Sequence, residues 1–219
     1  MARNKVHIYF VPGLSASSKI FEYLNLPSDK YTCHYIEWIT PKSKDESIES
    51  YASSLCKTIT EPNPVLVGVS FGGIMVQEMG RIIKTKKIII ISSVKSELEF
   101  PKKFTIAKIT HIYKIFPTKY IRQVELFVKN NFGKKAKKRM EIYQKYQTLI
   151  EPNYLDWAFY TILHWKKNYK SENLYHIHGD SDSIFPPKYI QNFIPIKDGT
   201  HTMILSKAKE ITKVLQEVI

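Results

Sequence analysis

Two almost uninterrupted apolar runs, residues 64–70 (PVLVGVS) and 86–94 (KKIIIISSV), constrain the fold of this chain more than any other feature. Each run has the length of a strand, is rich in β-branched residues and lacks the alternation of a strand with one face in water. Such runs are typical of strands that are covered on both faces in a parallel sheet. Residues 71–83 (FGGIMVQEMGRII) have the pattern of a helix, so the three segments predict a strand–helix–strand unit.

The rest of the chain continues this alternation on both sides of one long interruption. Further strands are predicted at 5–13, 31–39, 173–179 and 192–199, and further helices at 45–59 and 202–219. From about residue 100 to 170 the sequence instead becomes helical in pattern, aromatic and basic. We therefore predict a mostly parallel sheet flanked by helices, made of residues 1–99 and 171–219, with a helical cap, residues 100–170, inserted between two late strands.

The first apolar run ends at a serine with glycines on either side. Gly68-Val69-Ser70-Phe71-Gly72 fits G-x-S-x-G, the pattern of a nucleophile elbow between a strand and a helix. In such an elbow the serine has a strained backbone, and larger residues at the glycine positions would clash. The alternative is a glycine-rich turn without chemistry. The phosphate-binding patterns G-x-G-x-x-G and G-x-x-x-x-G-K-[ST] are absent.

A serine hydroxyl becomes a useful nucleophile only when a base takes its proton, and the base in turn needs an acid to orient it. His201, in IKDGTHTMIL, follows the last predicted strand, and Asp182, in IHGDSDSIFP, follows the preceding one. The chain order Ser70, Asp182, His201 is the order of serine, acid and histidine in one class of α/β hydrolytic enzymes. Asp180 remains an alternative for the acid.

On these residues the chain resembles the α/β-hydrolase superfamily, over most of its length outside the cap. The acid loop of that superfamily commonly reads G-x-x-D-x-hydrophobic-hydrophobic-P. The resemblance therefore favours Asp182 over Asp180 as the acid. The residues that match the pattern in register are Gly179, Asp182, Ile184, Phe185 and Pro186.

The resemblance also implies an oxyanion hole. The segment FVPGLSASSKIF, residues 10–21, resembles the oxyanion turn of the superfamily, although Pro12 stands where His is usual. The resemblance implies that the backbone N–H of Phe71 and that of Leu14 or Ser15 stabilise the oxyanion. We favour Leu14 because it directly follows Gly13.

Together these features predict a serine hydrolase, namely a carboxylesterase that cleaves small to medium acyl esters through an acyl-enzyme and needs no cofactor or metal. The same triad serves thioesterases, amidases and carbon–carbon hydrolases, and a non-catalytic protein that binds a small molecule remains an alternative. His176 and His178 alternate on a predicted strand, a spacing that two metal ligands could have. We interpret both as structural, with His178 near the acid loop.

The net charge of +13 is concentrated in the cap. Residues 101–170 hold 16 Lys and Arg against 4 Asp and Glu, a balance of +12. The run KKAKKR at 134–139 is interpreted as a solvated helix face. The alternatives are that the cap attracts an anionic ester, a phosphorylated or CoA-bearing acyl group, or a membrane surface. Nucleic acid is not expected, because no binding fold accompanies the charge.

The remaining sequence features bear on location and on the aromatic residues of the cap. No apolar window reaches the length of a membrane span, and the N-terminal apolar stretch is too short for a secretory signal, so a cytoplasmic protein is expected. Cys33 and Cys56 have neither metal nor redox spacing. The cap aromatics are predicted to be mostly core, with some lining an acyl pocket.

Overall fold

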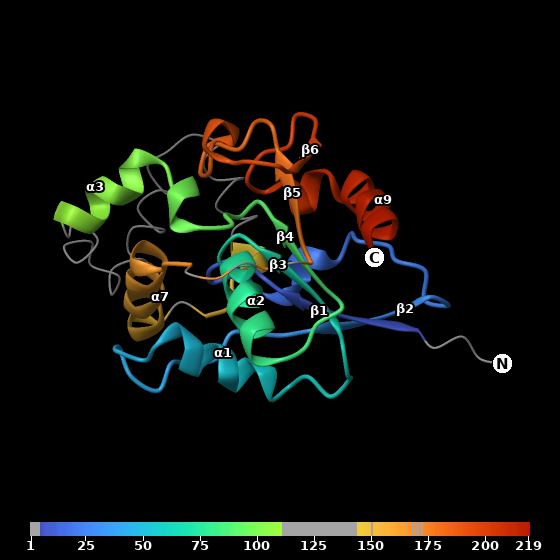
Figure 1. The fold of residues 1–219 in the computed structure, drawn as a ribbon, viewed down its shortest axis with the longest axis horizontal. Coiled ribbons are helices and arrows are strands. Elements are labelled where there is room, and N and C mark those ends of the chain that lie inside the picture. The colour runs from blue at the N-terminus through green and yellow to red at the C-terminus, as the bar shows by residue number, and fades with distance from the viewer. Residues whose placement is uncertain (1–4, 111–143, 150, 168, 170, 172) are drawn as a thin grey trace.

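A computed structural model describes residues 5–110, 144–149, 151–167, 169, 171 and 173–219 of the chain. Within these residues six strands form one parallel sheet, in the order β2-β1-β3-β4-β5-β6 (Figure 1). The strands are β1 (Val6–Val11), β2 (Tyr31–Tyr35), β3 (Val65–Val69), β4 (Lys87–Ile91), β5 (Leu174–Gly179) and β6 (Ile194–Ile196). The predicted parallel α/β sheet is confirmed.

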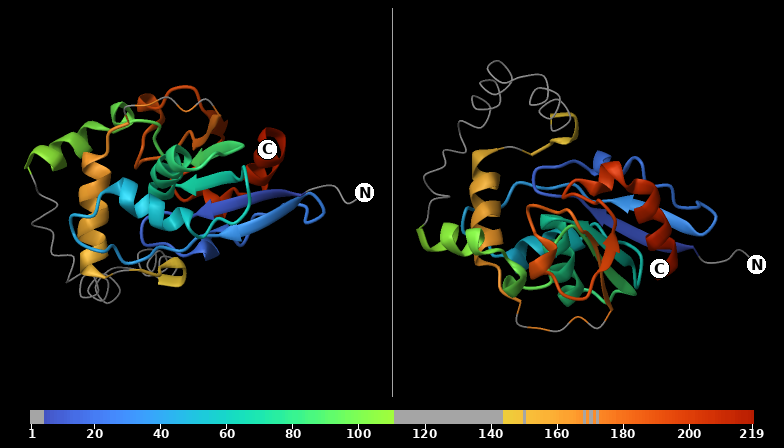
Figure 2. Two further views of the ribbon diagram at one scale, coloured as in Figure 1. Left: turned by 60° about the horizontal axis from the view of Figure 1, so that its bottom comes forward. Right: turned by 90° about the horizontal axis from the view of Figure 1, so that it is seen from above.

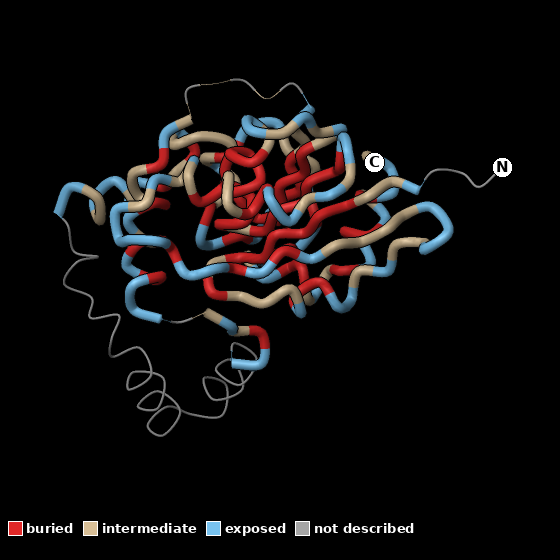
Figure 3. The backbone as a smooth tube through the Cα atoms, turned by 90° about the horizontal axis from the view of Figure 1, so that it is seen from below, coloured by how far each residue is buried: buried red, intermediate tan, exposed pale blue. Residues whose placement is uncertain are grey.

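Both faces of the sheet are covered, as the apolar runs predicted. All five residues of β3 are buried. Its Leu66 packs with the cluster that contains residues of α1 (Ile48–Cys56) and α2 (Phe71–Ile82). Val65 and Val67 pack with the cluster of the opposite face, which contains residues of α8 (Met203–Ser206) and α9 (Ala208–Val218). The buried residues gather along the middle of the sheet between these layers (Figure 3).

Several predicted elements are shorter in the structure, among them β6 (predicted at 192–199) and α1 (predicted at 45–59), and two further differences have a clear cause. The strand expected at 31–39 ends at Tyr35, because β1 leaves the sheet at Pro12 and offers no partner beyond Phe10, whose carbonyl accepts the N–H of Ile36. The single closing helix expected at 202–219 is broken at Lys207. The break lets α8 contact the short 3₁₀ helix η1 (Ser18–Phe21) while α9 contacts β5.

Between β4 and β5 the chain forms the described part of the cap. Its helices α3 (Lys102–Thr110) and α7 (Pro152–His164) lie together at one end of the molecule, away from α9 (Figures 1 and 2). One side of α7 is buried, and its buried residues include the aromatic Tyr154 and Trp157. A helical insertion between two late strands is therefore present, while the exact limits of the cap at 100 and 170 remain a prediction.

Several predictions about the cap fall outside the described residues. The basic run at 134–139 is one of them, as are the cap aromatics between 111 and 143. In the described part, Trp157 and Trp165 are core, whereas Tyr160 is 47% exposed. No helix in the described part of the chain is long and apolar enough to cross a membrane. Cys33 and Cys56 are both free thiols, and Cys56 is buried.

Candidate active site

Ser70 occupies a sharp turn between the end of β3 and the start of α2. Its backbone has φ 53° and ψ −118°, which a non-glycine residue rarely adopts. The neighbouring glycines are required by close contacts, since a Cβ on Gly68 would lie 2.1 Å from the carbonyl oxygen of Gly72. A Cβ on Gly72 would lie 2.3 Å from the carbonyl oxygen of Pro12. The turn therefore has the geometry of a nucleophile elbow.

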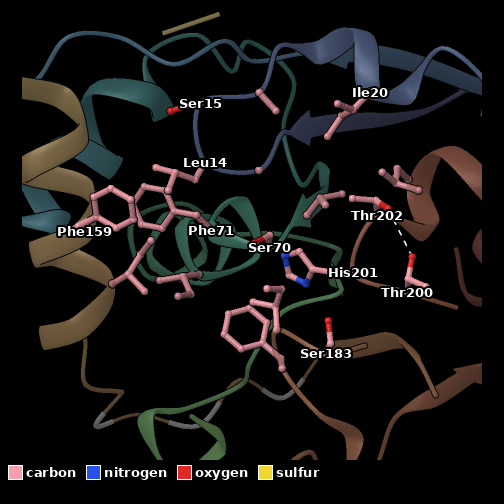
Figure 4. A pocket seen from close by; sticks show the side chains of 18 of the residues that line it. Leu14, Ser15, Ile20, Ser70, Phe71, Phe159, Ser183, Thr200, His201 and Thr202 are labelled. Atoms are coloured by element: carbon pink, nitrogen blue, oxygen red, sulfur yellow. Dashed lines mark hydrogen bonds between the residues drawn. The ribbon is translucent and has the colours of Figure 1, made fainter. Parts of the chain in front are cut away.

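His201 lies in the loop between β6 and α8, directly beside Ser70 (Figure 4). Its Nε2 is 3.0 Å from Ser70 Oγ, and its Nδ1 is 2.9 Å from Asp182 Oδ2. A carboxylate can only accept, so Nδ1 carries the proton and Nε2 accepts the hydrogen bond from the serine hydroxyl. The three sequence-predicted side chains are thus brought together in one hydrogen-bonded series.

Asp182, and not Asp180, is the carboxylate that meets the histidine. Asp182 is 2% exposed, and its Oδ1 accepts the backbone N–H groups of Ile184 (2.8 Å) and Phe185 (3.0 Å). Burial alone would raise the pKa of Asp182, but the hydrogen bonds from His201 and the two amides lower it below its ordinary value. Asp180 is exposed and accepts a hydrogen bond from the Ser181 hydroxyl.

Two buried histidines of β5 support the acid loop from behind. The Nε2–H of His178 donates to the Phe185 carbonyl at 2.8 Å, and the Nε2–H of His176 donates to His178 Nδ1 at 3.1 Å. Burial lowers the pKa of both rings, that of His176 well below its ordinary value, so both are neutral near pH 7. His178 therefore lies next to the acid loop, as the sequence predicted. The described part of the chain holds no group of three or more His, Cys, Asp or Glu side chains that could bind a metal ion.

The predicted oxyanion turn passes close to Ser70. The Ser15 N–H donates to the Tyr154 hydroxyl at 3.4 Å, whereas the Leu14 N–H has no hydrogen-bond partner among the described residues. Phe71 is the first residue of α2, and the first amides of a helix have no partner within it. Leu14 and Phe71 lie next to Ser70 in the site (Figure 4). The sequence-based preference for Leu14 over Ser15 fits this arrangement.

A cavity of about 1240 Å³ opens above Ser70 and His201. The core, α3, α7 and the segment 144–149 all contribute to its walls. Thr200, Thr202 and Gln147 were not singled out in the sequence, although both threonines flank His201 and so could have been identified with it. The apolar side chains that line the cavity include Leu14, Phe71, Ile74, Phe159, Ile162 and Leu163.

Comparison with solved structures identifies the fold that carries this site. A carboxylesterase of Nitrososphaera gargenis is 15% identical and has a TM-score of 0.69, covering 99% of this chain and 90% of its own. A bromoperoxidase of Bacillus anthracis is 17% identical with a TM-score of 0.68, and the match covers 98% of this chain and 92% of its own. An extracellular α/β-hydrolase of a Paenibacillus species is 15% identical with a TM-score of 0.62, and the match covers 97% of this chain and 98% of its own. The protein has the α/β-hydrolase fold. The fold predicted from the sequence is thereby confirmed.

The comparisons establish this fold and leave the activity open. The α/β-hydrolase structures above bear names of different activities at nearly equal similarity. No protein-family model matches the chain, and no curated protein matches its sequence. The activity of this α/β-hydrolase-fold protein must therefore be argued from its own site.

Proposed function

We propose that this protein is a serine hydrolase, specifically a carboxylesterase acting on small to medium acyl esters. The observation that carries the proposal is the continuous series Ser70 Oγ–His201 Nε2 (3.0 Å) and His201 Nδ1–Asp182 Oδ2 (2.9 Å) beneath a mostly apolar cavity. A turn that served structure alone would not need a buried carboxylate and a correctly oriented imidazole behind its serine.

In the first half of the proposed reaction the enzyme is acylated. Ser70 Oγ attacks the ester carbonyl carbon while His201 Nε2 takes the hydroxyl proton. The carbonyl oxygen becomes an oxyanion and is stabilised by the N–H groups of Leu14 and Phe71, which are fixed before charge develops. The C–O bond to the alcohol then breaks, and the imidazolium gives its proton to the departing oxygen.

In the second half, water replaces the alcohol. His201 Nε2 takes a proton from the water, whose oxygen attacks the acyl carbon, and the proton then returns to Ser70 Oγ as the carboxylic acid leaves. Asp182 stays ionised throughout, because its lowered pKa keeps it a carboxylate, and it stabilises the imidazolium by accepting from Nδ1–H.

The two sides of the cavity suggest how an ester lies in it. The leaving oxygen must reach His201 Nε2, so the alcohol portion belongs on the side of Thr200 and Thr202 (Figure 4). The acyl portion then extends away from His201, toward Phe71 and the α7 side chain Phe159. These walls are apolar, so an uncharged hydrocarbon acyl group is the substrate class that they fit.

A substrate panel tests the proposal. Butyrate linked to p-nitrophenol, to a thiol and to p-nitroaniline presents the same acyl group with three scissile bonds. The proposal expects the largest kcat/KM for the oxygen ester, and the p-nitrophenyl ester series from acetate to decanoate should have its optimum above acetate. Faster turnover of the thioester, after correction for the spontaneous rates of both, would contradict the carboxylesterase assignment.

A further inference from the structure

The oxyanion turn is held by hydrogen bonds from several parts of the chain. Gly13 is held by the core residue Trp38, because its carbonyl oxygen accepts the indole N–H of Trp38 at 2.7 Å. Ser15, two residues on, is 1% exposed and has φ 56°, in the left-handed region that a side-chain-bearing residue rarely adopts. A backbone in that region persists only when its surroundings hold it.

The contacts that hold Ser15 come from the cap. Its N–H donates to the hydroxyl of Tyr154 on α7 at 3.4 Å, and its carbonyl oxygen accepts the N–H of Thr148 at 2.9 Å. Two residues further on, the Ser17 N–H donates to the carbonyl oxygen of Tyr146 at 2.6 Å. The turn is therefore fastened to two cap segments that lie more than a hundred residues away in the sequence.

Tyr154 is itself fixed, and through the same aromatic cluster it reaches both proposed oxyanion donors. Its side chain is fully buried and packs with Trp38 and Trp157, each ring centroid at 6.1 Å. Trp38 also stacks on Phe71 at 5.1 Å. The cluster thus ties the turn that carries Leu14 to the residue that supplies the second amide.

We infer that Tyr154 is a positioning residue of the active site, which holds the Ser15 amide so that the preceding Leu14 N–H is left to the oxyanion. The inference rests on the proposed esterase function. The cap then completes the oxyanion hole in addition to enclosing the substrate. Because an oxyanion donor acts on the transition state more than on bound substrate, loss of its positioning lowers kcat and leaves KM nearly unchanged.

The experiment compares Tyr154→Phe with Tyr160→Phe, an identical change at an exposed position of the same helix. Each variant is assayed with p-nitrophenyl butyrate, and rates are divided by the concentration of active sites titrated with a fluorophosphonate, so that unfolded molecules do not contribute. Affinity for butylboronic acid, which forms a tetrahedral adduct with an active serine, is measured in parallel.

Tyr154→Phe is expected to lower kcat per titrated site by about 2- to 10-fold, the effect of one neutral hydrogen bond. KM should change little, and the boronate should bind more weakly by a similar factor, while Tyr160→Phe matches the wild type in all three. Equal kcat and boronate affinity in the two variants would overturn the inference and leave the esterase proposal intact. A wild type without turnover or labelling would contradict the esterase proposal itself, and the inference with it.

Discussion

His201 Nδ1 lies 2.9 Å from Asp182 Oδ2. Asp180, only two residues earlier on the same loop, is exposed. The difference arises from the turn after β5. The N–H groups of Ile184 and Phe185 hold Oδ1 of Asp182, which leaves Oδ2 directed at the imidazole. The two carboxylates therefore offer a matched pair of positions with very different environments.

Replacing Asp182 by Asn should nearly abolish turnover. An amide can donate to Nδ1 and so favour the tautomer whose Nε2 carries the proton and cannot accept one from Ser70. We expect kcat for p-nitrophenyl butyrate to fall by about 10⁴-fold, as expected for a triad that has lost its carboxylate. Asp180→Asn, the matched control, should retain the wild-type kcat. A larger loss in Asp180→Asn would mean that the acid has been assigned to the wrong residue.

Phe159 should limit the length of the acyl group. Its side chain reaches the cavity from α7, on the side of Ser70 away from Thr200 and Thr202 (Figure 4). Phe159→Ala is expected to move the chain-length optimum of kcat/KM for p-nitrophenyl esters to longer acids, because the removed ring leaves space beyond the acyl carbon. Tyr160→Ala, an exposed neighbour, should leave the optimum in place. An unchanged profile in Phe159→Ala would place the acyl group elsewhere in the cavity.

Gly72, the second residue of α2, should tolerate no side chain. A Cβ on Gly72 would meet backbone oxygens of Pro12 and Val11 at 2.3 and 2.4 Å, and these atoms can move only if β1 or the oxyanion turn shifts. Gly72→Ala is therefore expected to lower the free energy of unfolding by about 1–3 kcal/mol, measured by urea denaturation. A Cβ on Gly13 would come no nearer than 3.6 Å to its neighbours, so Gly13→Ala should cost less. Equal losses would contradict the packing described for the elbow.

Stability should fall as the pH drops below the ordinary pKa of histidine, about 6.5. The folded protein keeps His176 neutral because burial lowers its pKa, whereas the unfolded chain takes up the proton. The unfolded state then binds more protons than the folded state. The free energy of unfolding therefore rises with pH through this window, and the full stabilising contribution of neutral His176 is present above it.

His176→Phe should reduce this pH dependence. Without this imidazole, the free energy of unfolding should lose a slope of about 1 kcal/mol per pH unit between roughly pH 6.5 and 5. Urea denaturation of wild type and variant at pH 7.5, 6.5 and 5.5 measures it. The variant loses a donor to His178 Nδ1 and should be less stable at pH 7.5, but its stability should change less on acidification. Parallel pH curves would show that His176 is not the group responsible.

The parts of this fold that were predictable from sequence are those with strong local patterns. The buried strands β3 and β4 are continuous apolar runs, and the glycines around Ser70 are imposed by contacts within a few residues and with β1. His201 and Asp182 were identifiable because each follows a strand of a parallel sheet, where the carboxyl ends of the strands meet at one edge.

The parts that were not predictable depend on contacts between distant segments. The hydrogen bond from Ser15 to Tyr154 spans 139 residues, and the sequence around neither residue predicts it. The end of β2 at Tyr35 depends on where its partner β1 leaves the sheet, while the residues from 36 to 39 retain the composition of a strand. The break at Lys207 likewise reflects packing of α8 and α9 against different elements.

The most direct test of whether Ser70 is an activated nucleophile is labelling of the protein by a fluorophosphonate probe, which reacts with activated serines. Wild type and Ser70→Ala are compared after circular dichroism has shown that both are folded, and the labelled residue is located by peptide mass spectrometry. We predict that the wild type is labelled at Ser70, that Ser70→Ala is not labelled, and that its ester turnover falls by about 10⁶-fold. Equal labelling of both proteins, or none of the folded wild type, would contradict the assignment of Ser70 as an activated nucleophile.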